Sequence, residues 1–76
     1  MNTTFGYRQS KRDALAAFFR NQPNVWVDGT VLETIGGRYA WRTRVSDLQK
    51  QLGMSIENRL VKNSNIAISE YRYVPA

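Results

Sequence analysis

The sequence predicts an α+β fold in which three helices precede a C-terminal antiparallel β-hairpin. From Trp41 to Leu52, apolar residues recur at the spacing of one helix face, and no residue in that run breaks a helix. After Gly53, apolar residues alternate with polar ones, which is the period of a half-buried strand. A chain of 76 residues has room for one domain around one small core.

Composition narrows the class of protein. Hydrophobic residues make up 42% of the chain, with two Trp, four Tyr and three Phe, which suffices for a packed core and argues against overall disorder. Cysteine is absent, so we expect neither disulfides nor a thiolate metal site. No apolar run approaches the roughly 18 residues of a membrane span, and no signal peptide is evident. We therefore expect a soluble, cytoplasmic protein.

Charge points to the kind of partner. The formal net charge is +5, with 11 basic and 6 acidic residues, and the pI is about 10.1. This balance favours an anionic partner, with nucleic acid first and an anionic membrane surface second. Many small basic domains bind nothing anionic, so charge alone leaves the question open.

The N-terminal residues differ in composition from the rest. Residues 1–9 are mostly polar, and we expect a flexible arm there, ahead of one folded domain at residues 10–76. Ser10 is expected to begin the first helix, because Asp13 follows three residues later, as the acid does in a capping box.

The first two helices should each have one apolar face. Pro23 disfavours helix in the residue before it, so the first helix should end near Asn21. Asp28 is expected to cap a second helix at about residues 29–35, which the Gly36–Gly37 pair ends. The residues expected to face inward are Leu15, Phe18 and Phe19 on the first helix and Val31, Leu32 and Ile35 on the second.

The third helix carries the strongest pattern. Its expected buried stripe consists of Trp41, Val45, Leu48 and Leu52, while its other positions are mostly polar or basic. A very short β-prone run, Val25–Val27, separates the first two helices, and a glycine turn separates the second from the third. This order of elements is that of a helix-turn-helix unit.

The hairpin register follows from charge pairing. Residues 56–61 and 66–74 are expected to pair around a turn at Ser64–Asn65. That turn would place Glu57 opposite Arg72 and Arg59 opposite Glu70 on one face, and Ile56 and Asn58 opposite Tyr73 and Tyr71 on the core face. A one-residue slip would instead turn Ile66 and Ile68 toward the core, and the sequence leaves this alternative open.

The chain resembles winged helix-turn-helix domains, in particular those of small phage and prophage proteins. The resemblance rests on a glycine-containing turn with an aromatic, followed by the segments Arg44–Lys50, Ile56–Arg59 and Ser69–Arg72. It covers residues 10–74. It implies double-stranded DNA binding, with the third helix in the major groove and the hairpin, or wing, near phosphate or the minor groove. In this chain, Lys62 is the only charge close to the wing tip after Arg59.

The candidate site residues divide into two groups. Base readout is expected from one flank of the third helix and the positions beside it, namely Arg42, Thr43, Ser46, Gln49 and Lys50. Phosphate contacts are expected from Lys11, Arg12, Arg38, Tyr39, Arg44, Lys62 and Asn63. A solvated helix face, with Asp47 pairing with Arg44 or Lys50, is the structural alternative. Trp41 and Trp26 are expected to pack in the core or at an edge rather than to stack on bases.

Other functions find less support. The chain has no His and no Cys, its acids are scattered, and no glycine-rich loop has phosphate-binding spacing, so we expect no enzyme, metal or cofactor. The favoured function is a transcriptional regulator from a phage or mobile element, acting in the host cytoplasm. The alternative is a protein-interaction module that binds a host protein through the hairpin, where Val61 and Ile68 would form an exposed apolar pair. A homodimer is also compatible, because one helix reads few base pairs.

Overall fold

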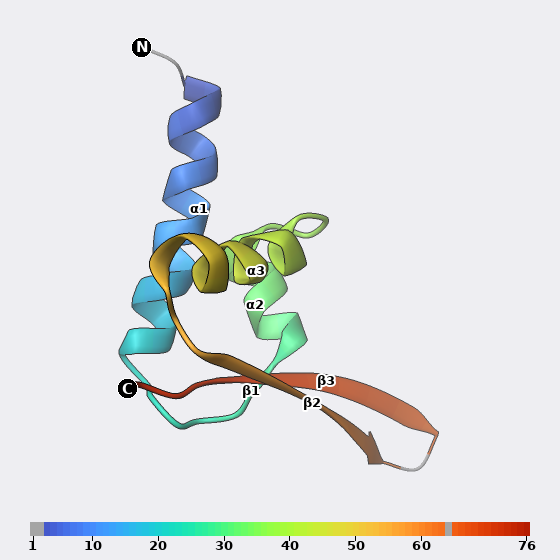
Figure 1. Cartoon of the computed structure of the whole chain (residues 1–76). Helices are drawn as coiled ribbons and strands as arrows, with labels where there is room; N and C mark the ends of the chain where they lie inside the picture. The colour runs from blue at the N-terminus through green and yellow to red at the C-terminus, as the bar shows by residue number, and fades with distance from the viewer. Residues whose placement is uncertain (1–2, 64) are drawn as a thin grey trace.

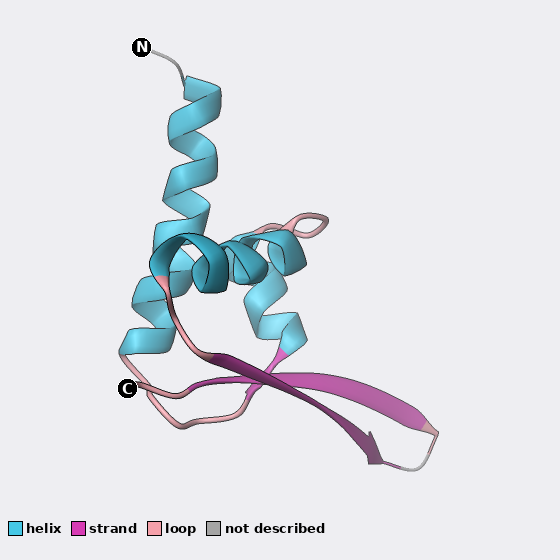
Figure 2. Ribbon diagram, viewed as in Figure 1, coloured by secondary structure: helices cyan, strands magenta, loops and turns pink. Residues whose placement is uncertain are grey.

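The computed structural model describes residues 3–63 and 65–76, with the backbone alone described at residues 3–9 and 63. Its elements, in chain order, are α1 (Thr3–Arg20), β1 (Val27–Asp28), α2 (Gly29–Gly36), α3 (Trp41–Leu52), β2 (Ile56–Asn63) and β3 (Ile66–Tyr73). Three helices cluster at one end, and the β2–β3 hairpin extends away from them (Figures 1 and 2). The α+β prediction is confirmed.

Helix α1 begins earlier than the sequence suggested. It runs from Thr3, so the prediction that Ser10 starts it is wrong, and the backbone is continuously helical across the expected boundary at residue 10. An N-cap residue needs a non-helical backbone, which Ser10 does not have. The Asp13 carboxylate accepts hydrogen bonds from Arg12 instead, at 3.0 and 3.1 Å. Met1 and Asn2, the first residues of the expected arm, lie outside the described residues.

Helix α2 is capped as predicted at both ends. The Asp28 carboxylate accepts hydrogen bonds from the Thr30 amide at 2.8 Å and from its hydroxyl at 2.9 Å. Gly37 ends the helix with φ of 101°, a backbone conformation that disfavours side chains. Leu32 is fully buried, but the inward orientation predicted for Val31 is wrong, since that residue is 41% exposed. The buried residues of α2 are Gly29, Leu32 and Gly36, which lie on one face of the helix.

Helix α3 packs the predicted stripe against the rest of the domain. Trp41, Val45 and Leu48 are buried, and Leu52 is partly buried beside them. The Trp41 ring meets the Tyr71 ring edge-on at 5.5 Å, so its predicted place in the core is confirmed. Gly53 ends the helix in the left-handed conformation, with φ of 65°, and its amide donates to the Leu48 carbonyl.

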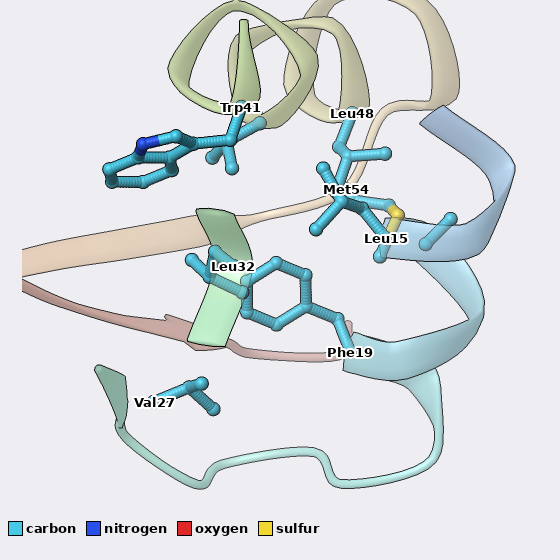
Figure 3. Close-up of a cluster of buried hydrophobic side chains, with 9 residues drawn as sticks. Leu15, Phe19, Val27, Leu32, Trp41, Leu48 and Met54 are labelled. Carbon is cyan, nitrogen blue, oxygen red and sulfur yellow. The ribbon is translucent and has the colours of Figure 1, made fainter. Parts of the chain in front are cut away.

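The core lies between the three helices and the sheet. Figure 3 shows Phe19 pointing from α1 toward Leu32 of α2, with Leu48 and Met54 close to Leu15. At Gly36 the helices approach so closely that a Cβ atom would lie 2.7 Å from Leu15 Cδ1. This packing fixes the buried side of α3, and therefore which of its residues face solvent.

The sheet confirms the predicted hairpin register. Glu57 pairs with Arg72 and Arg59 with Glu70 along the ladder, so the one-residue slip is excluded. The turn proposed at Ser64–Asn65 includes Ser64, which lies outside the described residues. The sequence did not predict that the short strand β1 would pair with β3, which gives a three-stranded antiparallel sheet in the order β1-β3-β2.

Candidate nucleic-acid interface

The outward side of α3 is polar and basic. Arg42, Thr43, Gln49 and Lys50 are exposed and Ser46 is half-buried, all on or beside the side away from the core. Neither Arg42 nor Lys50 forms an ion pair within the described part of the chain. The structure thus brings these five predicted residues together on one helix and leaves two of its cations without a carboxylate partner.

Arg42 is held near the start of α3. Its guanidinium lies 5.0 Å from the centre of the Trp41 ring, within the range of a cation–π contact. Because Trp41 is anchored in the core, this contact limits where the exposed arginine can point. Guanidinium groups present several N–H donors in one plane, which suits bidentate hydrogen bonding to a base edge.

Gln49 has a structural role that the sequence did not suggest. Its Nε2 donates to the backbone carbonyl of Ile56 at 2.9 Å, which links α3 to the first residue of β2. The amide keeps one N–H and its carbonyl oxygen for further hydrogen bonds. The Gln49 side chain therefore lies where the hairpin begins, between α3 and β2.

Arg44 and Asp47 form an ion pair on the opposite flank of α3. Arg44 Nη1 lies 2.8 Å from Asp47 Oδ2, and the two side chains are only 12% and 18% exposed. The pairing of Asp47 with Arg44, the structural alternative raised for this helix, is thus present. It leaves Arg44 less available to a phosphate than the exposed cations of the same helix.

Arg12 joins α1 to the end of α3. Its guanidinium donates to Gln51 Oε1 at 2.7 Å as well as to Asp13. Lys11 beside it is half-buried. Since α1 begins at Thr3 and not at Ser10 as predicted, both residues lie in the middle of a helix and not in its first turn.

The turn before α3 adds two exposed residues, Arg38 and Tyr39, to the candidate interface. Tyr39 is 92% exposed, and the Arg38 guanidinium lies 5.7 Å from the centre of its ring. This turn leads directly into the first residue of α3, Trp41, whose backbone N–H donates back to the Gly37 carbonyl at 3.1 Å. Arg38, Tyr39 and Arg42 are therefore close along the chain at the positive end of the helix dipole.

The outer half of the hairpin has few charges and several apolar side chains. Lys62 is exposed, while the side chain of Asn63 lies outside the described residues. Val61 and Ile68 are opposite each other, as predicted, but both are half-buried rather than exposed. The strongly exposed apolar residues of the hairpin are instead Leu60, at 60%, and Ile66, at 64%.

Trp26 marks a second cationic cluster that sequence analysis missed. The Arg59 and Arg72 guanidiniums lie 4.0 and 4.6 Å from the centre of its ring. Each arginine is also paired across the strands, Arg59 with Glu70 at 2.8 Å and Arg72 with Glu57. The signal that could have found this cluster is the alternation of Trp26 with Val27, because neighbouring residues of a strand face opposite sides and Val27 is buried. The tryptophan thus connects β1 to the hairpin.

These ion pairs distribute the positive charge unevenly. The two arginines near the middle of the hairpin are neutralised by glutamates of the neighbouring strand. Within the described residues, the cations that form no ion pair include three around α3, one near the hairpin tip and one at the end of α1, namely Arg38, Arg42, Lys50, Lys62 and Arg20. The net positive charge is thus concentrated around α3 rather than along the sheet.

In comparisons with models of protein families, with curated proteins and with solved structures, no match to the chain was found. Within the described residues, no group of three or more His, Cys, Asp or Glu side chains is arranged to hold a metal ion. The same residues contain no helix that is both long and apolar enough to cross a bilayer.

Proposed function

We propose that the protein is a small winged helix-turn-helix domain that binds double-stranded DNA and acts as a transcriptional regulator of phage or mobile-element type. One observation carries the proposal. A firmly packed helix, α3, presents Arg42, Thr43 and Lys50 to solvent, and neither cation is neutralised by an acid within the described residues. An α-helix fits the major groove of B-DNA, where such side chains can reach base edges.

The proposal divides the site into base-reading and backbone-binding residues. Arg42, Thr43 and Lys50 would read bases, with Ser46 beside them. Arg38 and Tyr39 would bind phosphate at the start of the helix, where the helix dipole also favours an anion. Lys62 would bind phosphate from the hairpin. Gln49, bonded to Ile56, would set the position of the wing relative to α3.

A second function is favoured by a different observation. Leu60 and Ile66 are large apolar side chains that remain mostly exposed on the hairpin. Such residues can contact a protein partner, so the alternative is a module that binds and modulates another protein through its wing. Binding of that kind would change little with ionic strength, because it does not release counterions from DNA.

The deciding experiment is DNA binding at two salt concentrations. Affinity for a mixed-sequence duplex should fall steeply between about 50 and 200 mM salt, since each phosphate contact adds about −0.9 to the slope of log K against log salt. The Arg42→Ala/Lys50→Ala variant should lose most of the binding. Arg20→Ala is the charge-matched control for the single variant Arg42→Ala, because Arg20 is exposed at the far end of α1 and its loss should change affinity little.

The experiment also separates the two functions. Absence of binding at low salt, with circular dichroism showing a folded domain, would overturn the DNA proposal. An equal loss in the Arg20 variant would mean that net charge, and not α3, carries the binding.

A further inference from the structure

Strand β2 forms an open edge of the sheet. The strand order is β1-β3-β2, so β3 covers one side of β2 and no strand among the described residues covers the other. Strand β1, on the far side of β3, has only two residues. A row of backbone N–H and C=O groups on an uncovered edge is able to pair with a further strand.

Two hydrogen bonds show which residues of β2 turn these groups outward. The Tyr73 carbonyl accepts from the Asn24 amide at 2.8 Å, on the side of β3 away from β2. The Ile56 carbonyl, opposite Tyr73 in the ladder, accepts from Gln49 at 2.9 Å. This pair therefore directs its backbone groups away from each other. Because the direction alternates along an antiparallel ladder, Asn58, Leu60 and Lys62 also direct theirs toward the open edge.

The side chains along this edge are suited to another copy of the same strand. Leu60 is 60% exposed, and Ile56, four residues earlier on the same face, is partly buried against the core. On the other face stand Glu57 and Arg59, one acid and one base two residues apart. Both β2 residues form ion pairs within the chain, and each has a side chain that is 47% exposed. Their partners on β3 are less exposed, with Arg72 at 31% and Glu70 at 23%.

We propose that two copies of the chain associate through antiparallel pairing of their β2 strands, on a two-fold axis at Asn58. In this register, Glu57 of each copy faces Arg59 of the other, so two ion pairs form. The Ile56 side chain of each copy contacts Leu60 of the other, which covers the exposed leucine. In this register the Ile56 carbonyl must also accept a hydrogen bond from the other copy. It can do so because Gln49 occupies only one of its two lone pairs.

Neighbouring registers are disfavoured by charge. An axis at Glu57 places the two Glu57 carboxylates opposite each other, and an axis at Arg59 does the same for the two guanidiniums, which is destabilising. An axis at Leu60 places Arg59 opposite Val61 and forms no ion pair. Charged residues on an edge strand normally prevent such pairing, and here they select a single register.

The contact is small. Pairing of about five residues from each chain buries less than the roughly 1,000 Å² expected of a stable interface. The association should therefore be detected best by a method that traps a weak complex or works at high protein concentration. It requires no DNA, so its outcome is independent of the proposed function.

Disulfide trapping tests the position of the axis. The chain has no cysteine, so a single introduced cysteine forms a disulfide only between copies. In Asn58→Cys, the two Cα atoms would be about 5.5 Å apart across the axis, within disulfide range. The matched control is Lys62→Cys, also exposed on β2, whose two Cα atoms would be about 27 Å apart at about 3.4 Å per residue.

We expect oxidation to convert the Asn58→Cys variant to a disulfide dimer at least about tenfold faster than the Lys62→Cys variant, by an effective-concentration argument. Equal rates, or faster conversion of Lys62→Cys, would overturn the proposal. Circular dichroism of both reduced variants checks that each is folded.

A set of charge exchanges tests the ion pairs without breaking the intrachain ones. The double variant Glu57→Arg/Arg72→Glu keeps its own ion pair but places the arginine introduced at position 57 against Arg59 of the other copy. Adding Arg59→Glu and Glu70→Arg restores opposite charges both within and between chains. Sedimentation equilibrium at millimolar protein should show weaker association of the double variant than of the wild type, by about tenfold or more, and recovery in the quadruple variant. A monomeric wild type, or equal association of all three, would refute this register.

Discussion

Helix α3 with the turn before it and the β2–β3 hairpin differ in how many of their cations are paired with an acid. Within the described residues, Arg44 is the one paired cation of the first region, and Lys62 is the one cation of the hairpin without an ion pair. On α3 and the turn before it, Arg38, Arg42 and Lys50 form no ion pair within the described residues. On the hairpin, Arg59 and Arg72 are each paired with a glutamate of the neighbouring strand. Net charge alone therefore does not locate an anion-binding surface. Whether each cation has an acidic partner must also be known, because a neutralised arginine attracts a phosphate less strongly.

The two regions also differ in how they are held. Helix α3 buries three of its residues and leaves a polar side exposed. The outer half of the hairpin leaves Leu60 and Ile66 mostly exposed. A rigid element suits the reading of bases, whereas exposed apolar side chains suit contacts with protein. Four predictions, in decreasing order of effect, test this contrast.

Leu48→Ala should have the strongest effect. Leu48 is fully buried, and truncating such a leucine costs about 2–5 kcal/mol of unfolding free energy, from lost burial and the cavity left behind. Leu60→Ala, on the hairpin, should change stability by no more than about 0.5 kcal/mol, because the side chain is exposed. Urea denaturation of both variants measures the difference. Equal losses would mean that the hairpin is as tightly packed as α3.

Arg42→Ala should come next, with an effect on DNA affinity. Loss of a bidentate base contact costs about 1–3 kcal/mol on the preferred sequence and less on others, so the sequence preference should relax. A site selected from random duplexes, compared with a scrambled one, provides the measurement. If the variant loses affinity equally on both duplexes, Arg42 binds the backbone and does not read a base.

Arg38→Ala should weaken binding in a different way. As a phosphate contact it should lower affinity to a similar degree on all sequences and reduce the salt slope by about one unit. Binding isotherms at several salt concentrations measure that slope. Arg59→Ala serves as the matched arginine control, and it should leave the slope nearly unchanged because Glu70 neutralises Arg59 in the folded protein.

The weakest effect is expected from the hairpin ion pairs. Arg59 and Glu70 are partly exposed, at 47% and 23%, so solvent screens their attraction, and their coupling should be about 0.2–1 kcal/mol. A double-mutant cycle with Arg59→Ala and Glu70→Ala, followed by thermal unfolding, measures it. Coupling well above this range would indicate that the stack on Trp26 binds the three side chains into one cooperative unit.

The sequence predicted some features of α3 and α2 correctly and others not. The stripe on α3 was predicted correctly because a helix with a clear apolar repeat can bury only that face. The role of Gln49 was missed, because nothing in its own helix indicates that the Ile56 carbonyl lies within 2.9 Å. The exposure of Val31 was missed because the apolar pattern did not show that α2 buries the face of Gly29, Leu32 and Gly36, which are three and four residues apart, and Val31 does not lie on that face.

Local sequence was enough to predict the order of elements, the caps of α2 and the buried stripe of α3, and it favoured the hairpin register that the ladder has, although a one-residue slip was excluded only by the structure. Each of these depends on residues close in the chain or on cross-strand charges that only one register satisfies. Tertiary packing was needed to decide where α1 begins, that β1 joins the sheet, and that Arg59 and Arg72 stack on Trp26. These features depend on contacts between segments distant in sequence, and local periodicity contains no information about which distant groups will meet.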